Sequence, residues 1–300
     1  MRTGCRGGGG SVLYVPDMVG IRPRSTVSAW QPPVPGIAEV FHARFTDHAY
    51  PAHVHETWAL MILDGGRVDF ALDRERHGAG VSDSVVLLPP GVVHDGRTVT
   101  EAGFRKRVLY LDTSVLPEGL AGAAVDTPLL RDPALRERVH GLHLALGSGA
   151  GAGAAAVAVP AEGFEAESRL AFVQERLWRW LAGREGPAAY EAPGAGVAVR
   201  LRELLDARVA EGITLQEASA ELGHVHPTHL IRSFRRAYGL PPHAYLTGRR
   251  VDAARRLLLA GMRPVEAATA AGFYDQAHLA RHFGRHVGTS PARFARSGLA

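Results

Sequence analysis

Residues 217–245 and 266–294 are two copies of one pattern, and this duplication restricts the possible folds more than any other feature of the chain. At an offset of 49 residues, ten of the 29 aligned positions are identical without a gap. A solenoid needs at least three repeats to bury a continuous core. Two copies therefore predict a pair of small helical units that pack against each other.

Each copy has the signals of a helix, a tight turn and a second helix. In the first copy, Thr214 and Glu217 form a capping box that begins a helix. Gly223 permits the turn, Pro227 is tolerated at the start of the next helix, and Gly239 ends that helix. The second copy has its own signals at Pro264, Gly272, Gln276 and Gly288. This arrangement is the helix-turn-helix unit of DNA-binding proteins.

The second helix of each copy combines a buried stripe with a basic face. Leu230 and Phe234 are four residues apart, as are their counterparts in the other copy, so they are predicted to face the core. The remaining faces carry Thr228, Arg232, Arg235 and Arg236 in one copy, and Gln276, Arg281 and Arg285 in the other. Arginine can pair with guanine edges or phosphates, and glutamine with adenine. A single exposed arginine is more often simply solvated, but the same basic face in both copies favours DNA contact.

A long helix is predicted between the copies, from 244 to 260. Its roughly 17–19 residues correspond to about 27 Å at 1.5 Å per residue. A rod of this length can hold two recognition helices about one DNA turn apart, near 34 Å. Paired arginines lie along it, and we expect Arg255 to contact a phosphate and not a base.

The motifs of this region match a known family. They are Arg250-Val251-x-x-Ala254-x-x-Leu257-Leu258, Ala267-Ala268-x-x-Ala271-Gly272-Phe273-Tyr274-Asp275-Gln276-Ala277-His278-Leu279-x-Arg281-His282-Phe283 and Gly288-Thr289-Ser290-Pro291-x-x-Phe294. Over residues 197–296 the chain resembles the AraC/XylS family of bacterial transcription regulators. The resemblance implies base-facing positions at Pro227, Thr228, Ile231 and Arg232 in the first copy, and at Gln276, Ala277, Ala280 and Arg281 in the second. Arg235 and Arg285 belong to the same two DNA-contacting faces. Since Thr228 and Ile231 are not strongly polar, the first copy is expected to use methyl contacts and Arg232.

The positive charge of the chain is concentrated toward its C-terminus. From Val197 onward there are 15 arginines and eight acidic residues, a net charge of +7, whereas residues 1–196 carry 19 basic and 22 acidic residues, a net charge of −3. A basic module behind a slightly acidic one predicts that DNA contact is confined to the C-terminal part. Lys106 is the only lysine of the chain, which we attribute to compositional bias.

The N-terminal residues show no pattern of a targeting signal. Residues 1–11 lack the apolar region of a signal peptide, and no apolar run approaches the length of a bilayer span. Cys5 is the only cysteine, which excludes an intramolecular disulfide. We therefore expect a cytoplasmic protein whose residues 1–24 form a disordered tail.

Residues 37–111 have the pattern of short β strands separated by turns. The predicted strands cover 37–45, 58–63, 68–72, 84–88 and 104–110, with Gly- and Pro-containing turns between them, one of them at 64–66. Strands this short and regularly spaced indicate a sandwich or a small barrel.

Three histidines of this region lie in two motifs, His53-x-His55 and Pro89-x-Gly91-x-x-His94. Histidines two apart on one strand point to the same face, and a third from a facing strand could complete a metal triad. The motifs resemble the two cupin motifs, but Ala59 and Leu60 stand where cupin enzymes carry a glutamate ligand. Sensor domains of AraC-like regulators share this framework around an effector pocket. The resemblance thus implies effector binding by His53, His55, Trp58 and His94. The alternatives are that the three histidines only pack, or that they hold a divalent metal.

Two stretches after the predicted strands, 134–146 and 165–181, have apolar residues at helical spacing. Such a pair of helices resembles the dimerisation element of the family, although it could instead only cover the β domain. Trp178 and Trp180 are either interface anchors or core residues, and we favour the core. The Gly- and Ala-rich run 147–158 is predicted to be a flexible loop, and 183–196 an interdomain linker.

These features predict an α+β multidomain protein. It would consist of a disordered tail (1–24), a cupin-like β-barrel effector-binding domain (25–125), a helical dimerisation segment (126–182), a linker (183–196) and an all-α domain with two helix-turn-helix motifs (197–300). The predicted function is a DNA-binding transcription regulator, of the activator type, controlled by a small-molecule effector. Double-stranded DNA, the effector, RNA polymerase and a second copy are the expected partners, without membrane contact, cofactor or catalytic residue. The alternatives are a metal-dependent cupin enzyme fused to a DNA-binding domain, and an effector-independent architectural DNA-binding protein.

Overall fold

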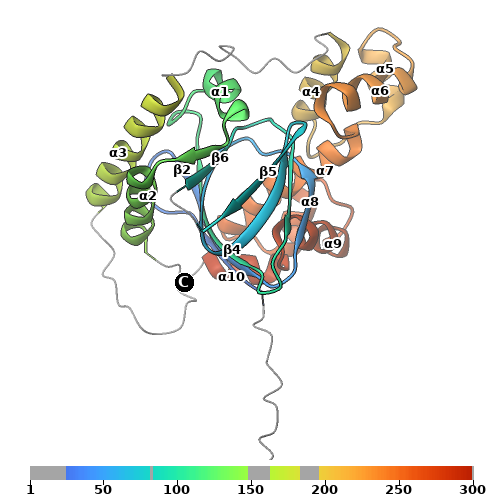
Figure 1. The fold of residues 1–300 in the computed structure, drawn as a ribbon. Coiled ribbons are helices and arrows are strands. Elements are labelled where there is room, and N and C mark those ends of the chain that lie inside the picture. Colours follow the sequence, from blue (N-terminus) through green and yellow to red (C-terminus); the bar gives the residue numbers. More distant parts are fainter. Residues whose placement is uncertain (1–24, 82–83, 148–162, 183–195, 299–300) are drawn as a thin grey trace, which may run out of the picture.

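The computed structural model describes residues 25–81, 84–147, 163–182 and 196–298. The predicted tail at 1–24, residues 148–158 of the predicted loop and residues 183–195 of the predicted linker lie outside the described residues. Strands fill the N-terminal half of the described chain and helices its C-terminal half (Figure 1). The predicted order of an antiparallel β domain followed by an all-helical domain is confirmed. None of the described helices is long and apolar enough to cross a membrane.

The described strands form one antiparallel sheet of nine members. The strand order is β1-β2-β8-β4-β6-β9, with β5 and β7 also paired to β4, and β3 paired to β7. Their bounds are β1 Thr26–Trp30, β2 Ile37–Phe45, β3 Ala49–His53, β4 Trp58–Leu72, β5 Glu75–Gly80, β6 Ser84–Leu88, β7 His94–Thr98, β8 Phe104–Leu111 and β9 Leu129–Arg131.

The longest strand, β4, replaces two of the predicted strands. Its 15 residues continue through Asp64-Gly65-Gly66, so the turn predicted there is wrong. A register shift against β8 lies between Leu63 and Gly65, and from Arg67 onward β4 pairs with β5 and β7. The two glycines therefore allow a bulge that redirects the strand without ending it.

The two faces of the sheet have different partners because side chains alternate along each strand. On β4, Ala59 and Met61 face the interior of the β domain, whereas Trp58 and Leu60 belong to a second core. This second core lies between the outer face of the sheet and three helices. They are α1 (Ala121–Asp126), which follows the short 3₁₀ turn Glu118–Leu120, α2 (Pro133–Ala145) and α3 (Gly163–Ala182).

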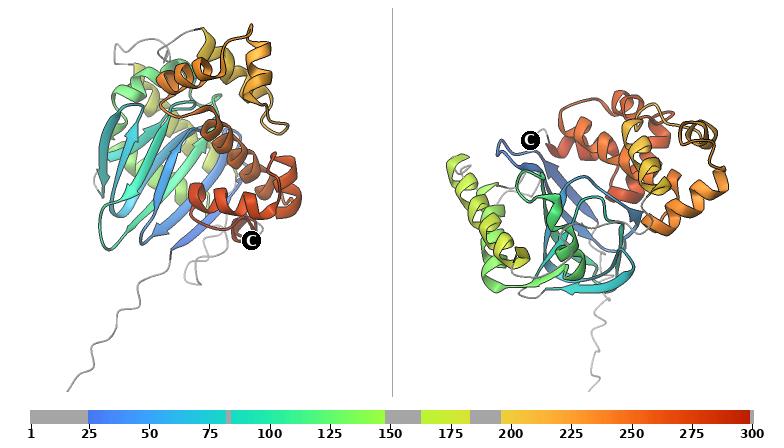
Figure 2. Two further views of the ribbon diagram at one scale, coloured as in Figure 1. Left: turned by 90° about the vertical axis from the view of Figure 1, so that its right-hand side faces the viewer. Right: turned by 90° about the horizontal axis from the view of Figure 1, so that it is seen from above.

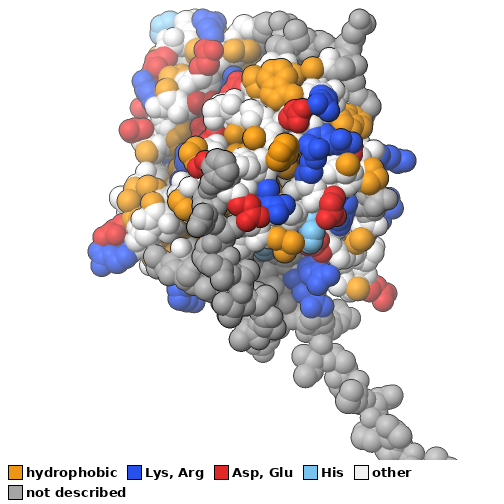
Figure 3. Space-filling model, turned by 90° about the vertical axis from the view of Figure 1, so that its left-hand side faces the viewer, with side chains coloured by type: hydrophobic (Ala, Val, Ile, Leu, Met, Phe, Trp, Pro, Cys, Tyr) orange, Lys and Arg blue, Asp and Glu red, His pale blue; other side chains and the backbone are white. Residues whose placement is uncertain are grey.

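Helices α2 and α3 closely match the two predicted helices after the strands. Leu170 and Leu177 of α3 lie on its buried stripe, and Trp180 is half-buried beside them. Trp178 is 40% exposed because it falls off this stripe, so its predicted place in the core is wrong. Figure 3 shows this side of the molecule, where hydrophobic side chains are interspersed with charged ones.

The C-terminal domain contains both repeats in the predicted order. Its helices are α4 (Val197–Ala207), α5 (Leu215–Glu221), α6 (Pro227–Tyr238), α7 (Pro242–Leu259), α8 (Pro264–Ala270), α9 (Gln276–Val287) and α10 (Pro291–Gly298). The capping box of Thr214 and Glu217 begins α5. Recognition helices α6 and α9 end at Gly239 and Gly288, whose φ values of 72° and 80° are left-handed and suit glycine.

The β domain and the second repeat share one hydrophobic core. Phe41 and Phe45 of β2 belong to the same cluster as Phe283 of α9 and the α10 residue Phe294. Helix α10 lies along β1, and α9 packs on β3, as the views in Figure 2 show for the flank of the sheet. The first repeat has a separate core, to which the β domain contributes Val54 and Val93.

Candidate functional site

The outward faces of α6 and α9 carry most of the side chains predicted to contact DNA. The exposed ones are Thr228, Arg232 and Arg235 on α6, and Gln276, Ala277, Arg281 and Arg285 on α9. Within the described ranges, none of these four arginines pairs with a carboxylate, whereas Arg249 and Arg256 of α7 do. Exposed, unpaired guanidinium groups remain free to bind phosphates or base edges.

Three of the predicted contact positions are half-buried: Pro227, Ile231 and Ala280. Ile231 lines a groove together with Leu201 and Pro241, so part of its side chain packs inside the domain. Pro227 opens α6, where His226 Nδ1 accepts from Thr228 N at 3.3 Å. These positions are therefore less available to DNA than the arginines.

A cavity of about 70 Å³ lies within the β domain, and both domains line it. Phe41, Met61 and Phe104 are among its apolar walls. Val251 of α7 and His286 of α9 belong to the side that the C-terminal domain closes. A ligand in this cavity would therefore touch the helix between the two repeats and the second recognition helix directly.

The three predicted histidines meet at the wall of this cavity. The ring centroids of His53 and His55 lie 4.3 and 4.6 Å from that of His94. Strand β3 ends at His53, so His55 lies in the connection to β4. The prediction that both histidines lie on one strand is wrong. The Nδ1 atoms of His53, His55 and His94 donate to the carbonyl oxygens of Pro51, Thr57 and Val92 at 2.8, 2.7 and 3.1 Å.

These hydrogen bonds define the chemistry of the histidine cluster (His53, His55 and His94). A carbonyl oxygen can only accept, so each Nδ1 carries the proton and each Nε2 of a neutral ring is an acceptor. Burial lowers the pKa of His94 to about 4, and burial followed by the neighbouring rings lowers the pKa of His53 and His55 well below the usual range. The cluster thus offers neutral acceptors to a ligand. Among the described residues, no group of three or more His, Cys, Asp or Glu is arranged to hold a metal ion.

Lys106 projects into the same cavity, although sequence reasoning assigned it no function. It shares the inward side of β8 with Phe104. Its Nζ lies 4.3 Å from the ring centroid of Tyr50 and 5.5 Å from that of Phe41, and no acceptor within the described part of the chain binds it. Burial, and then the nearby Arg255, lower the pKa of Lys106 to about 7. The sequence signal was available: a lysine at an inward position of an otherwise apolar strand face.

Arg255 joins the two domains and is not available to a phosphate, so that prediction is wrong. Its Nη2 donates to Glu39 Oε1 of β2 at 2.7 Å, and both residues are buried. Its guanidinium also lies 4.4 Å from the ring centroid of Tyr110. The reason for the difference is that α7 turns this side toward the β domain and not toward solvent.

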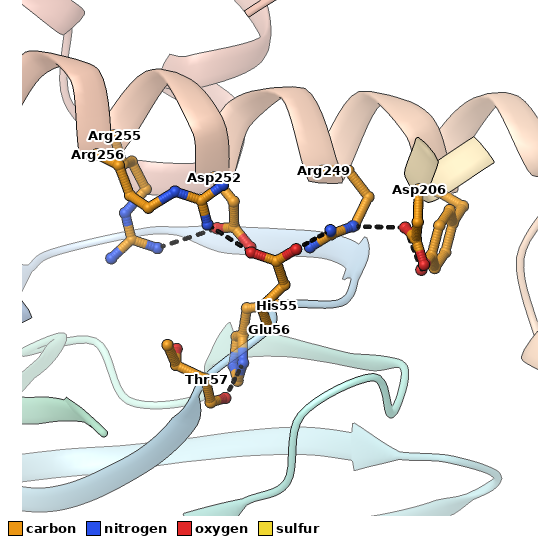
Figure 4. Close-up of polar contacts among 9 residues, drawn as sticks. His55, Glu56, Thr57, Asp206, Arg249, Asp252, Arg255 and Arg256 are labelled. Carbon is orange, nitrogen blue, oxygen red and sulfur yellow. Dashed lines mark hydrogen bonds and ion pairs between the residues drawn. The ribbon is translucent and has the colours of Figure 1, made fainter. Parts of the chain in front are cut away.

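Glu56 makes a second bridge between the domains (Figure 4). It lies in the connection between β3 and β4 and binds both Arg249 and Arg256 of α7, the latter at 2.6 Å. Arg249 also donates to Asp206 of α4 at 2.8 Å. Arg249 and Arg256 of α7 thus connect the C-terminal domain to the β domain.

Trp58 does not line the cavity, so its predicted contact with an effector is wrong. It is fully buried in the outer core, and its Nε1 donates to Leu116 O at 2.5 Å. Because side chains alternate along β4, its neighbours Ala59 and Met61 face the cavity instead.

Two family models match the chain. The model of the AraC-like ligand binding domain matches residues 36–162, and that of a helix-turn-helix domain matches residues 219–297. An uncharacterized HTH-type transcriptional regulator of Bacillus subtilis (strain 168), YbfI, is 40% identical over 77 residues. These residues are 26% of this chain and 28% of that relative, so the match spans less than a third of the relative's length.

Crystal structures of ToxT from Vibrio cholerae have a similar fold over most of the chain. ToxT of strain O395 has a TM-score of 0.54 at 11% identity, covering 91% of this chain and 97% of that one. Wild-type ToxT of strain SCE256 with bound unsaturated fatty acid has a TM-score of 0.55 at 11% identity, covering 91% and 94%. At this identity, the similarity concerns the fold alone.

Proposed function

The chain belongs to the AraC/XylS family of transcription regulators, which is not a family of enzymes, and on that basis we propose a regulator whose DNA binding is controlled by a small molecule in the cavity. The observation that carries this proposal is that both the β domain and helices α7 and α9 line one cavity. Helix α9 is one of the two recognition helices, and α7 connects it to the other. A ligand in the cavity would therefore change how α6 and α9 are positioned toward DNA.

Sequence-specific reading would be shared between the two recognition helices. Gln276 and Arg281 would read bases from α9, while Thr228 and Arg232 would do so from α6. Helix α7 has 18 residues, so it spans about 27 Å and would set the two helices about one DNA turn apart. Exposure and the absence of carboxylate partners for these arginines in the described chain support this role.

The size of the cavity would couple ligand binding to the domain contact. An engineered apolar cavity of about 150 Å³ accommodates a benzene ring, whereas the cavity here has about 70 Å³. A larger effector would enter only if α7 or α9 moved outward, which strains the ion pair between Arg255 and Glu39. Such a ligand would bind the two arrangements unequally and shift their populations. ToxT with a bound unsaturated fatty acid supports a ligand-binding role for this fold.

We also propose a homodimer that forms through the outer face of α2 and α3. Leu144, Phe172 and Trp178 on this face are 62%, 57% and 40% exposed, and a second copy would cover them. The inner faces of both helices cover the sheet at the same time, so one role does not exclude the other. The proposed regulator activates transcription through RNA polymerase. Its effector-binding domain ends at residue 125, its dimerisation segment at 182 and its linker at 196.

Selection of bound DNA from a random pool with the full-length chain tests this function. Two enriched blocks with a spacing of about one helical turn, roughly 10–11 base pairs, are expected. Arg232→Ala should relax the preference at one position of one block, and Arg281→Ala at one position of the other. Failure to enrich any sequence would overturn the proposal. A selected operator whose affinity no small molecule alters would instead indicate an effector-independent architectural protein.

A further inference from the structure

We propose that the cavity binds a small organic carboxylate whose anionic group contacts Lys106 and Tyr50. The same ligand carries a hydrogen-bond donor, which meets the histidine cluster. This inference names the ligand class of the proposed regulator and rests on that function. It follows from three groups at the cavity whose bonding capacity the described protein leaves unused.

The first group is the ammonium of Lys106, a half-buried residue in the cavity wall, which has no ionic partner among the described residues. Arg255, the other cation at the cavity, is neutralised by Glu39 at 2.7 Å. The two acids that line the cavity are engaged elsewhere: Asp95 accepts from Ala71 N at 2.7 Å, and Asp252 lies 3.6 Å from Arg255. A buried ammonium is unfavourable unless it is paired, and aromatic faces compensate only in part. A ligand carboxylate would supply the partner.

The second group is the hydroxyl of Tyr50. Its oxygen is buried and has no hydrogen-bond partner in the described structure. The ring of Tyr50 lies against the ammonium of Lys106, with 4.3 Å between ring centroid and Nζ. A hydroxyl and an ammonium on one wall are two donors, and a carboxylate has two oxygens to accept from them.

The third group is the set of Nε2 atoms of the histidine cluster. Each Nδ1 is occupied by a backbone carbonyl, so Nε2 can only accept as long as the ring is neutral. Such a surface repels a second carboxylate and attracts a hydroxyl or amide N–H. Between these polar ends the walls are apolar. At about 70 Å³ the cavity suits a body of few carbon atoms, and a longer body requires the C-terminal helices to move.

The single lysine of the chain permits a direct test. Selective carbon-13 labelling of lysine in the full-length protein gives one side-chain signal, that of Lys106. Its pKa is followed by NMR in the presence of lactate, propionate or lactamide, and of the larger probes para-hydroxybenzoate, benzoate or para-hydroxybenzamide. The acids should raise the pKa of Lys106, and the neutral amides should not. Each hydroxylated acid should bind more tightly than its parent acid.

Matched variants separate the site from general effects. Lys106→Met should weaken acid binding about tenfold or more, whereas Trp58→Phe, outside the cavity, should leave it unchanged. If Lys106→Met does not fold, Tyr50→Phe removes a single oxygen and should weaken the acids but not the amides.

The outcomes for ligand class and for regulatory function can be distinguished. If no acid at millimolar concentration shifts the Lys106 signal in protein that still selects DNA, the carboxylate site is overturned and the regulator stands. Equal shifts by acids and amides also overturn it, because they would reflect ring contact alone. Loss of DNA selection in the wild-type chain counts against the regulator itself.

Discussion

Arg255 of α7 and Glu39 of β2 form an ion pair of 2.7 Å whose side chains are 11% and 8% exposed. The pair connects residues that are 216 positions apart in the chain. Burial raises the pKa of Glu39, and the adjacent guanidinium of Arg255 offsets only part of this increase. The position of the helix between the two repeats thus depends on a carboxylate of the sensor.

Glu39→Gln should loosen α7 from the β domain. The substitution leaves the buried charge of Arg255 with only the longer 3.6 Å contact to Asp252 among the described residues, and breaking a buried pair costs about 3–5 kcal/mol. We expect a lower free energy of unfolding by chemical denaturation and faster amide hydrogen exchange in α7. Glu75→Gln, at an exposed residue of β5, is the control and should change neither quantity. Wild-type stability and exchange in Glu39→Gln would show that the ion pair does not hold the helix.

Gly288→Ala should separate α9 from the β domain. Both Gly288 and Gly223 have positive φ, 80° and 87°, so alanine costs roughly 1 kcal/mol at either position. A Cβ at Gly288 would also overlap the Phe45 ring, whereas a Cβ at Gly223 meets nothing within 4 Å. Gly288→Ala should therefore destabilise more than Gly223→Ala and make α9 more sensitive to limited proteolysis. Equal losses of stability in the two variants would mean that the Phe45 ring moves aside for the added Cβ at little cost.

Trp58→Phe should reduce stability without affecting ligand binding. The substitution removes the hydrogen bond to Leu116 O and leaves space in the outer core, with an expected loss of about 1–3 kcal/mol. Thermal unfolding measures this loss, and calorimetric titration with para-hydroxybenzoate measures affinity. A changed affinity in folded protein would show that Trp58 contributes to ligand binding.

Carboxylate affinity should fall as pH rises through neutrality. Lysine binds an anion in its protonated form, and the pKa of free Lys106 is about 7. The affinity is therefore fully present below pH 7 and lost above it, so the dissociation constant should rise about tenfold between pH 6 and pH 8. Asp252, whose pKa burial raises to about 6, gains negative charge over the same range and acts in the same direction.

The other titratable and charged groups at the cavity leave this direction unchanged. They are Tyr50, His53, His55, His94, Asp95, Tyr110, Arg255 and His286. Burial lowers the pKa of each of the four histidines, which favours their neutral forms. Calorimetry at a series of pH values is the measurement. Lys106→Arg keeps its charge and should give a flatter profile, and an equally steep one would assign the effect to Asp252.

Arg281→Ala should relax sequence preference at one position of the operator. A bidentate contact of arginine with a base is worth about 1–3 kcal/mol of discrimination. Binding titrations with the selected operator and single-base variants would show this loss. Arg179→Ala removes an exposed charge from α3, away from the recognition helices, and is the control. Uniform weakening across all sequences would assign Arg281 to a phosphate.

The helices of the two repeats could be predicted because their signals are local. The capping box at Thr214 and the terminal glycines Gly239 and Gly288 act within one or two turns of the chain. The continuous strand β4 could not be predicted in this way. Locally Gly65-Gly66 has the sequence of a turn, and only pairing with the distant β8 keeps the strand extended.

The site was predicted only where a motif defined it. The spacing of the three histidines identified a shared surface, but the face of β4 that points inward depends on register, and a shift of one residue exchanges the faces. Trp58 was therefore placed in the cavity and Met61 was missed. The interdomain pairs of Glu39 and Glu56 depend on how distant segments dock, which no local pattern contains.

The shared core of the β domain and the second repeat has a consequence for modularity. A chimera joined at 183–196 would cut between domains in the sequence, but it would replace one wall of a continuous interior that contains Phe45 and Phe283. Among the described buried residues, the core of the first repeat takes only Val54 and Val93 from the β domain, so this repeat could be exchanged with fewer compensating changes. The first repeat can therefore be exchanged between proteins of this architecture more easily than the second, and with it the DNA sequence that this repeat reads.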